Sequence, residues 1–179
     1  MALRVIGIVG IWSIRLYEPV WRHLREAFLG QFPGATFATE DMFFSPWQGK
    51  KMRAFADSIV CKYDDGGDDV LLVGWSMGGT IATAIAPKFK RTRVRGVVTI
   101  FSPHTLLWGL FSWMLGSNLK GIGVPVVSCS ARFDWIVLWG GRYPAALKHF
   151  RVRCDHLLGL LIGTKRTELI AKEAREVLV

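Results

Sequence analysis

The feature that most constrains this chain is a glycine-flanked serine between an apolar run and a run of small residues. Residues 74–78 read Gly-Trp-Ser-Met-Gly, with Ser76 at the centre. Residues 69–73 before them read Asp-Val-Leu-Leu-Val, a composition typical of a buried parallel strand. Residues 79–86 are small or apolar and predict a helix that packs closely on a sheet. The pattern therefore predicts a strand, a tight turn and a helix, in that order.

The rest of the chain alternates between strand-like and helix-like patterns. We expect strands near residues 3–9, 35–38, 70–74, 95–101, 124–129 and 149–154, and helices near residues 17–30, 49–62, 78–88, 142–148 and 164–178. Such alternation forms a parallel sheet that is covered on both faces. The expected fold class is α/β, a minimal three-layer αβα sandwich around a central parallel sheet of about six strands.

Length and composition favour one domain over residues 1–179. The chain has 179 residues, of which 51% are hydrophobic, enough for a core of its own. A domain of this size buries roughly 70% of its unfolded surface. No linker-like tract, internal repeat or low-complexity segment divides the sequence.

The serine turn matches the Gly-x-Ser-x-Gly pattern of a nucleophile elbow. In that turn the serine backbone is strained, with a positive φ, and glycines two residues away avoid collisions across the turn. We therefore expect Ser76 to be a catalytic nucleophile. The alternative is an ordinary strand-to-helix turn with a surface serine.

A serine nucleophile needs a base and an acid, which follow it in this order: serine, acid, histidine. The carboxylates after Ser76 are Asp134, Asp155, Glu168, Glu173 and Glu176. The three glutamates lie in the expected last helix, and Asp155 directly neighbours the best histidine. Asp134 instead follows the expected strand near residues 124–129, at its carboxyl end. We expect Asp134 to be the acid, with capping of the next turn as its alternative role.

The candidate base is His156, which follows the expected strand near residues 149–154. His23 precedes the serine, and His149 falls at the amino end of its strand. His104 follows another expected strand, but a loop role is favoured for it on position alone. His156 has both the required order and the required edge, so it would accept the Ser76 proton while Asp134 orients its ring.

The developing oxyanion needs backbone donors, each worth about 3 kcal/mol in comparable sites. One donor is expected from the N–H of Met77, the residue after the nucleophile. A second is expected at the end of the first strand, from the N–H of Ile11, with Trp12 as the alternative.

Together, residues 74–78, Asp134 and residues 155–157 (Asp-His-Leu) resemble the smallest α/β-hydrolases. These include minimal lid-less bacterial lipases and the compact serine hydrolases of the YdeN-like group. The resemblance covers nearly the whole chain in order and spacing, and it implies this fold and a serine hydrolase activity. One departure is that many such enzymes carry His-Gly where this chain has Val9-Gly10, which concerns the second oxyanion donor.

An apolar segment after the strand near residues 95–101 is a candidate wall of an acyl groove. Residues 106–115 include Leu106 and Trp108 and are too few to span a bilayer. Core packing is the alternative role. Trp12 and Trp75 adjoin the two oxyanion elements, so we also expect them to contact substrate.

The net charge of +9 raises the question of anionic partners. Five basic residues fall within residues 88–95, between a helix and the start of the next strand, at the edge opposite the expected site. A solvated basic connection is favoured there, so no nucleic-acid partner is expected, although weak contact with an anionic surface is allowed. The acidic residues 64–69 are likewise expected to form a solvated helix-to-strand connection.

No cofactor or metal is expected. The sequence lacks zinc-ligand spacing and a Walker A loop, and residues 7–10 fall short of a dinucleotide fingerprint. The three cysteines are an odd number for a disulfide framework, and no signal peptide pattern opens the sequence as given, so we expect a cytoplasmic location.

The expected activity is hydrolysis of carboxylic esters with apolar or medium-chain acyl groups, small-molecule or lipid, through an acyl-enzyme. Two alternatives stay open. The same triad acts on thioesters or amides, and the Val9-Gly10 departure leaves room for a binding module that kept the fold without the activity. The sequence leaves the oligomeric state undecided.

Overall fold

A central parallel sheet organises the part of the chain that the computed structural model describes, which is residues 2–11, 18–42, 48–104, 114–116, 120–134, 137, 141–154 and 164–178. The strands are β1 (Leu3–Ile11), β2 (Thr36–Met42), β3 (Asp69–Trp75), β4 (Val94–Ile100), β5 (Val126–Ala131) and β6 (Lys148–Val152). The helices are α1 (Glu18–Gln31), α2 (Gly49–Tyr63), α3 (Met77–Ile85), the short 3-10 helix η2 (Ala86–Lys88) and α5 (Thr164–Leu178).

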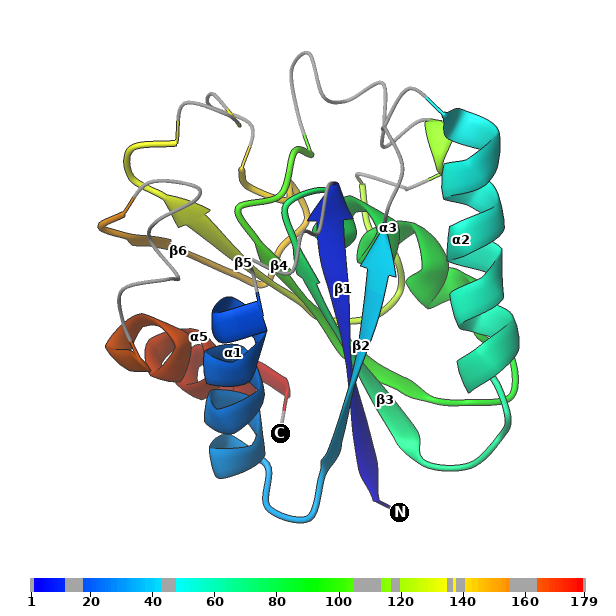
Figure 1. Ribbon diagram of the computed structural model, residues 1–179, viewed down its shortest axis with the longest axis horizontal. Helices are drawn as coiled ribbons and strands as arrows, with labels where there is room; N and C mark the ends of the chain where they lie inside the picture. Colours follow the sequence, from blue (N-terminus) through cyan, green and yellow to red (C-terminus); the bar gives the residue numbers. More distant parts are fainter. Residues whose placement is uncertain are drawn as a thin grey trace.

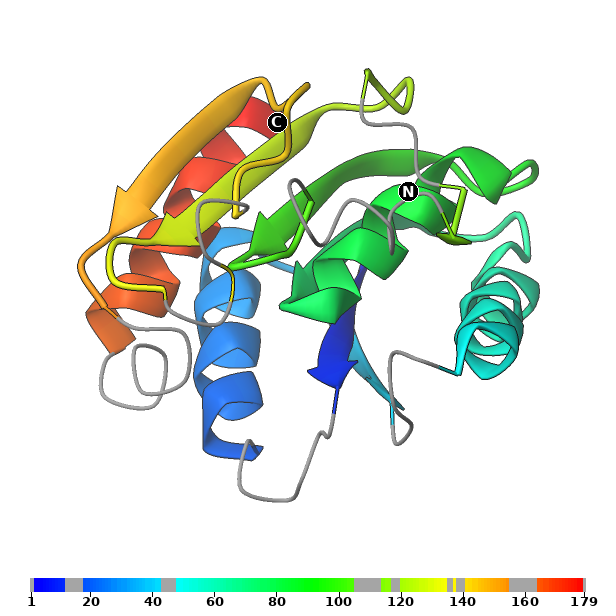
Figure 2. The ribbon, with the colours of Figure 1, turned by 90° about the horizontal axis from the view of Figure 1, so that it is seen from above.

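The sheet has six strands in the order β2-β1-β3-β4-β5-β6, and every neighbouring pair is parallel. Helices α1 and α5 pack together on one face, and α2 and α3 cover the other (Figures 1 and 2). The predicted three-layer α/β fold with a parallel sheet of about six strands is confirmed.

Strand β3 shows why the sheet needs helices on both faces, because each of its seven residues is buried. Leu71 and Val73 belong to the hydrophobic cluster beneath α1 and α5, whereas Val70 and Leu72 belong to the cluster beneath α2 and α3. Successive side chains of a strand point to opposite faces, so an unbroken apolar run supplies both clusters.

Among the helices described, none is long and apolar enough to cross a membrane.

The order of the strands creates a switch point at the centre of the sheet. From β1 the chain passes through α1 to β2 on one side of β1, while β3 pairs with β1 on the other side. Crevices that bind ligands in open α/β sheets lie at such a point, outside the carboxyl ends of the strands. The fold therefore directs attention to the ends of β1 and β3.

The helix expected near residues 142–148 is wrong. Two backbone groups there bond to β5: the Leu147 N–H donates to the Val126 carbonyl at 2.9 Å, and the Tyr143 N–H donates to Ser128 Oγ at 3.0 Å. The Ala146 N–H donates to the Tyr143 carbonyl at 3.1 Å, which closes a turn. Pro144 lies within this stretch and has no N–H to give to a helix. The segment forms turns that lead directly into β6.

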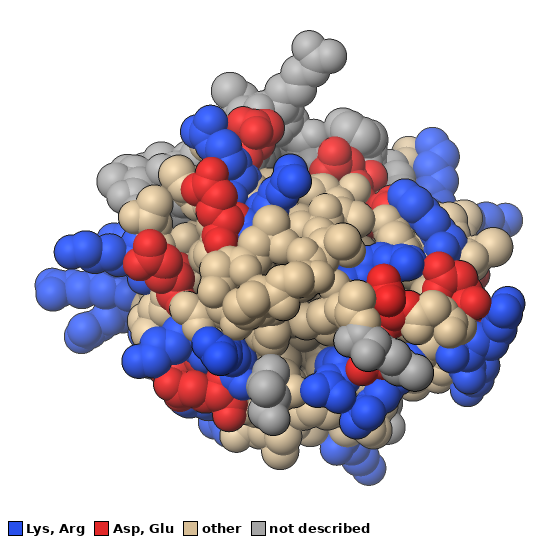
Figure 3. Space-filling view, turned by 90° about the horizontal axis from the view of Figure 1, so that it is seen from below, with Lys and Arg blue, Asp and Glu red and all other residues tan. Residues whose placement is uncertain are grey.

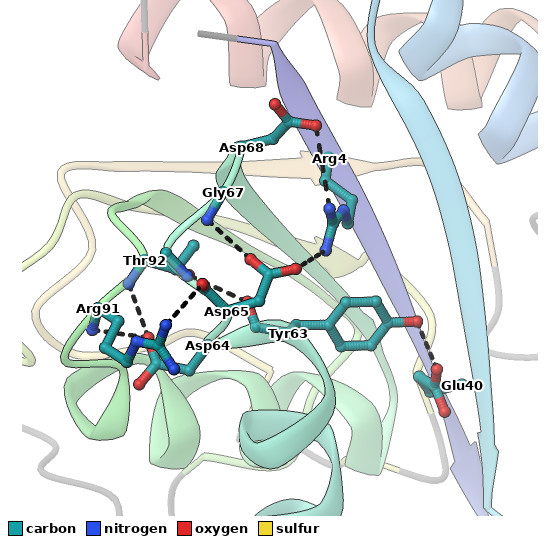
Figure 4. A network of polar contacts seen from close by, with 10 residues as sticks. Arg4, Glu40, Tyr63, Asp64, Asp65, Gly67, Asp68, Arg91 and Thr92 are labelled. Carbon is teal, nitrogen blue, oxygen red and sulfur yellow. Dashed lines mark hydrogen bonds and ion pairs between the residues drawn. The ribbon is translucent and has the colours of Figure 1, made fainter.

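The acidic turn and the basic connection are structural partners (Figure 4). The Asp64 carboxylate accepts the backbone N–H groups of Lys90, Arg91 and Thr92 at 2.9, 2.7 and 2.7 Å. Asp65 forms an ion pair with Arg4 at 3.1 Å. The acidic residues connect α2 to β3 as predicted, and Asp64 binds the basic connection through its backbone N–H groups.

Candidate active site

Ser76 occupies a sharp turn between β3 and α3. Its φ of 54° and ψ of −128° lie in a region that residues other than glycine rarely adopt. Its N–H donates to the Ile100 carbonyl of β4 at 2.8 Å, and its carbonyl accepts the Gly79 N–H at 3.1 Å. Ser76 is partly exposed, whereas every other residue from Asp69 to Ala86 is buried. The turn thus brings one hydroxyl from a buried strand and helix to the surface.

The glycines of the turn are required by close contacts. A Cβ at Gly78 would collide with the backbone carbonyl of Ile8 in β1. A Cβ at Gly74 would collide with the backbone of Gly78 itself. Because these neighbours are backbone atoms, no rotamer change relieves the collisions, and the structure explains both glycines as the sequence pattern predicted.

Gly10, near the end of β1, faces the serine directly. A Cβ built on Gly10 would lie 2.8 Å from Ser76 Cβ and 3.3 Å from Ser76 Oγ. The pairing of β1 with β2 is also irregular here: between Ile8 and Ile11, β1 advances three residues while its partner advances two, from Glu40 to Met42. Such a bulge redirects backbone groups, and it falls beside the serine.

In the sequence, Gly10 was singled out only as part of Val9-Gly10, and its steric role was not predicted. The signal was a glycine at the end of the first strand, next to the strand that carries the serine.

Met77, the first residue of α3, is buried, and its N–H belongs to the helix N-terminus, where the macrodipole favours negative charge. Of Ile11 only the backbone is described, and Trp12 lies outside the described residues.

Asp134 lies three residues past the end of β5, as predicted. Its Oδ1 accepts the Val137 N–H at 2.7 Å, so it caps the following turn. The backbone next to it is tied to the end of β6, because the Phe133 N–H donates to the Cys154 carbonyl at 3.1 Å and the Arg132 N–H donates to that of Val152 at 2.9 Å. The structure therefore holds the Asp134 turn beside the segment that leads to His156, which itself lies outside the described residues.

None of the described histidines is hydrogen-bonded to Ser76. His23 faces Glu26 on α1, with 3.9 Å between Nδ1 and Oε2. His149 Nε2 lies 3.3 Å from Ser130 Oγ, and burial, followed by the charge of Arg142, lowers the pKa of its imidazole.

His104 is fully buried just past β4. Neither of its ring nitrogens has a hydrogen-bond partner, and its ring meets the Tyr143 ring edge-on, with 5.1 Å between centroids. Burial lowers the pKa of His104 to about 3, so this imidazole is neutral at ordinary pH. It behaves as a packing residue in the segment that follows β4, whereas its position in the sequence favoured a loop role.

Of the residues expected to contact substrate, Trp75 is the one that the structure describes. Trp75 is buried, with 3% exposed, in the cluster with α1 and α5, so packing is the role the structure describes for it. Leu106 and Trp108 lie outside the described residues. Within the described ranges, no three His, Cys, Asp or Glu side chains gather as metal ligands would.

Comparison with known proteins finds one matching family and several solved structures with a similar fold. A family model described as "Alpha/beta hydrolase family" matches residues 10–168. Among solved structures, the chain is similar to the esterase domain of a Rhodothermus marinus protein, with 16% identity, a TM-score of 0.64 and coverage of 99% of this chain and 88% of that one. It is also similar to a putative YdeN-like hydrolase from Pectobacterium atrosepticum, with 14% identity, a TM-score of 0.68 and coverage of 98% and 90%.

A third similar structure is Est1E from Butyrivibrio proteoclasticus, with 14% identity, a TM-score of 0.67 and coverage of 98% of this chain and 86% of that one. No sequence among the curated proteins matches the chain. At such low identity the structural likeness shows the fold alone. The match to the family model covers most of the chain.

Proposed function

Because the chain belongs to the alpha/beta hydrolase family, we propose that it is a serine hydrolase of carboxylic esters, with Ser76 as nucleophile, His156 as base and Asp134 as acid. The observation that carries the proposal is the Ser76 turn. The Ser76 backbone is strained and the residue is partly exposed. It lies beside Gly10, at the switch point between β1 and β3. Strain of this kind costs of order 1–3 kcal/mol and collects at functional sites.

In the proposed reaction, Ser76 Oγ attacks the acyl carbonyl carbon while His156 accepts the hydroxyl proton. The C–O bond to the alcohol then breaks, and the imidazolium returns the proton to the leaving oxygen. Water, activated by the same imidazole, attacks the acyl-enzyme and releases the carboxylic acid. Asp134 holds the imidazole in the required tautomer and stabilises its charged form.

The position of His156 is supported by the described backbone around it. His156 follows Cys154 by two residues, so their Cα atoms are within about 7 Å of each other. The Cys154 carbonyl is bonded to Phe133, the residue before Asp134. The capping bond from Val137 to Asp134 Oδ1 gives the carboxylate a fixed orientation and leaves its role as the acid compatible with its role in the turn.

The oxyanion donors in this proposal are the N–H groups of Met77 and Ile11. Met77 begins α3, where the helix N-terminus presents N–H groups and positive potential. Ile11 follows Gly10 at the bulged end of β1, and Gly10 faces Ser76, which supports the Ile11 N–H as the second donor. A backbone donor needs no His-Gly pair, so Val9-Gly10 is compatible with activity.

We propose that the substrate is a small ester with an apolar acyl group, bound against Trp12, Leu106 and Trp108, with Trp75 supporting the floor from below. The same three catalytic groups act on thioesters and amides in principle. The ester is favoured over the amide because its alkoxide leaving group needs less proton donation from the His156 imidazolium than the nitrogen of an amide does.

The test is turnover of matched ester, thioester and aryl-amide substrates over a series of acyl chain lengths. We expect the ester to be turned over fastest, Ser76→Ala to abolish turnover, and Ser130→Ala, at the other Ser–His contact, to leave it unchanged. The rate should rise with pH through one ionisation near 7, as an ordinary imidazole requires. Loss of turnover in Ser130→Ala but not in Ser76→Ala would overturn the assignment, and failure of all substrates would favour a binding module.

A further inference from the structure

A cavity lies at the end of the sheet opposite Ser76. Its volume is about 320 Å³, and it is lined by Ala2, Leu3, Phe32, Asp69, Leu71, Arg93, Arg95 and Leu178. These residues come from the amino ends of β1, β3 and β4 and from the ends of the chain segments that carry α1 and α5. Along β1, seven residue-to-residue steps from Leu3 to Gly10 separate it from the serine, a distance of about 23 Å. Ligands at the two places would not touch.

Apolar side chains form the inner part of this cavity, whereas polar atoms make up slightly more than half of its exposed lining. Leu71 is buried in the sheet, Phe32 and Leu178 are buried at the ends of α1 and α5, which pack together on one face, and Leu3 packs against the same cluster. Figure 3 views this end of the molecule and shows uncharged surface at its centre with charged side chains around it. A cavity of this size is at the lower end of the range for small-molecule sites, which are mostly apolar with a few polar groups.

The rim carries two arginines in different states. Arg95 faces Asp69, with 3.6 Å between Nη1 and Oδ2, and the Asp69 side chain is only 12% exposed. Arg93 is exposed, and among the described residues its guanidinium has no acid or carbonyl as a partner. Its backbone is fixed, since the Arg93 carbonyl accepts the Val70 N–H at 2.9 Å. The acid at the rim is thus already matched, and one guanidinium remains for a ligand.

From this arrangement we propose that the cavity binds a medium-chain monocarboxylate, with its aliphatic chain against Leu3, Leu71 and Leu178 and its carboxylate on Arg93. A guanidinium binds a carboxylate through two parallel N–H···O bonds, which a neutral head group cannot reproduce. A dicarboxylate is disfavoured because Asp69 and the apolar wall offer nothing to a second anion.

This site has a consequence that rests on the proposed function. Ester hydrolysis releases a carboxylate of the same class, so the molecule would have a place to hold its product away from Ser76. Binding itself is independent of that reaction and is therefore measured in a protein that cannot perform it.

The test uses octanoate and Ser76→Ala, with calorimetry for affinity and backbone NMR for location. We expect octanoate to shift the amide signals of Leu3, Leu71 and Leu178, and neutral octanamide to bind at least about tenfold more weakly, since charge-assisted hydrogen bonds are lost. Arg93→Gln should weaken octanoate binding by at least about tenfold. Lys90→Gln is the matched control, because it removes one positive charge from the same connection without lining the cavity, and it should change affinity by less than about twofold.

A second variant keeps the test independent of any effect of Arg93→Gln on folding. Ala2 is exposed at the rim, so Ala2→Phe fills the mouth without disturbing the core, and we expect it to abolish these shifts. The proposal is overturned if octanoate shifts only residues near Ser76, if Arg93→Gln binds it as wild type does, or if octanamide binds equally well. If octanoate binds in this cavity while the wild-type protein has no esterase activity, the proposed function is contradicted and the inference about the cavity stands.

Discussion

At the scale of single residues, two strained positions lie side by side. Ser76 and Phe101 are the described residues other than glycine with positive φ, at 54° and 51°. Each directly follows a strand, and the last residues of those strands, Trp75 and Ile100, are paired in register. The Phe101 N–H donates to the Cys129 carbonyl at 2.8 Å, just as Ser76 bonds to the strand next to it. The rim is therefore built by two neighbouring strands that turn sharply at the same level.

Gly10 provides a direct test of how closely the serine must be held. In Gly10→Ala the new methyl group would lie 2.8 Å from Ser76 Cβ, which forces the serine or β1 to shift. A displacement of about 1 Å in a catalytic group can cost roughly 100-fold in rate, and we expect a loss of ester turnover of that order.

Gly30→Ala is the matched control for this substitution. Gly30 lies in α1, and nothing lies within 4 Å of a Cβ placed there. This variant should gain about 0.5–1 kcal/mol in unfolding free energy from helix propensity, with unchanged turnover. Equal turnover in the two variants would contradict the close contact between β1 and the serine.

His104 predicts a pH dependence of stability. Its folded pKa of about 3 is below the ordinary value of 6.5, so the unfolded chain takes up a proton that the folded chain does not. This stability is complete above pH 6.5 and is lost as the pH falls from 6.5 towards 3. Between pH 7.5 and 5.5 we expect wild type to lose about 1 kcal/mol more than His104→Phe, measured by urea unfolding. Parallel losses in both proteins would show that His104 is not buried as a neutral ring.

At the scale of elements, strands and helices were predictable where their own residues decide them. The apolar run of β3, the glycines of the turn and the small residues of α3 act locally, and all six strands were predicted. The segment at residues 142–148 could not be read in this way, because its backbone groups bond to β5, which is distant in sequence. Tertiary hydrogen bonds overrode its helix-like pattern.

Of the candidate site, the structure describes the positions of two predicted catalytic residues. The order and strand ends pointed to Ser76 and Asp134, and the structure places both at the carboxyl edge of the sheet. The bulge in β1 and the contact between Gly10 and Ser76 depend on the register between strands, which no local pattern encodes. For the same reason, the pairing of the acidic turn with the basic connection could not be inferred from charge alone.

The connection between α2 and β3 should be a local source of stability. Burial acts to raise the pKa of Asp64, but the N–H groups of Lys90, Thr92 and Arg91 outweigh it and hold the pKa below its ordinary value. Asp64→Ala removes the acceptor of three backbone N–H groups, but water replaces it at the exposed Lys90 and Arg91, so we expect a cost of about 1 kcal/mol in urea unfolding.

Two controls separate this role from simple surface charge. Asp64→Asn keeps an acceptor oxygen and should cost less. Asp57→Ala removes an exposed partner of Lys88 and should cost less than about 1 kcal/mol. If Asp64→Ala is no more costly than Asp57→Ala, the turn does not depend on these hydrogen bonds.

At the scale of the whole molecule, one sheet serves both hydrophobic clusters. Strand β3 contributes alternate residues to each cluster, so neither helical layer keeps its packing if the sheet comes apart. We propose that residues 1–179 fold as a single domain, and we expect one cooperative unfolding transition, with coincident midpoints by tryptophan fluorescence and far-ultraviolet circular dichroism. Two separated midpoints would contradict a single cooperative unit.

The central claim is that Ser76 is an activated nucleophile, and covalent labelling with a fluorophosphonate tests it most directly. Intact-mass measurement and peptide mapping should find one adduct on Ser76 in the wild-type protein and none in Ser76→Ala. Labelling of His156→Ala should be slower by roughly 100-fold or more, because the base is missing. An adduct on a different residue, or a protein that hydrolyses esters while Ser76 stays unmodified, would contradict the account.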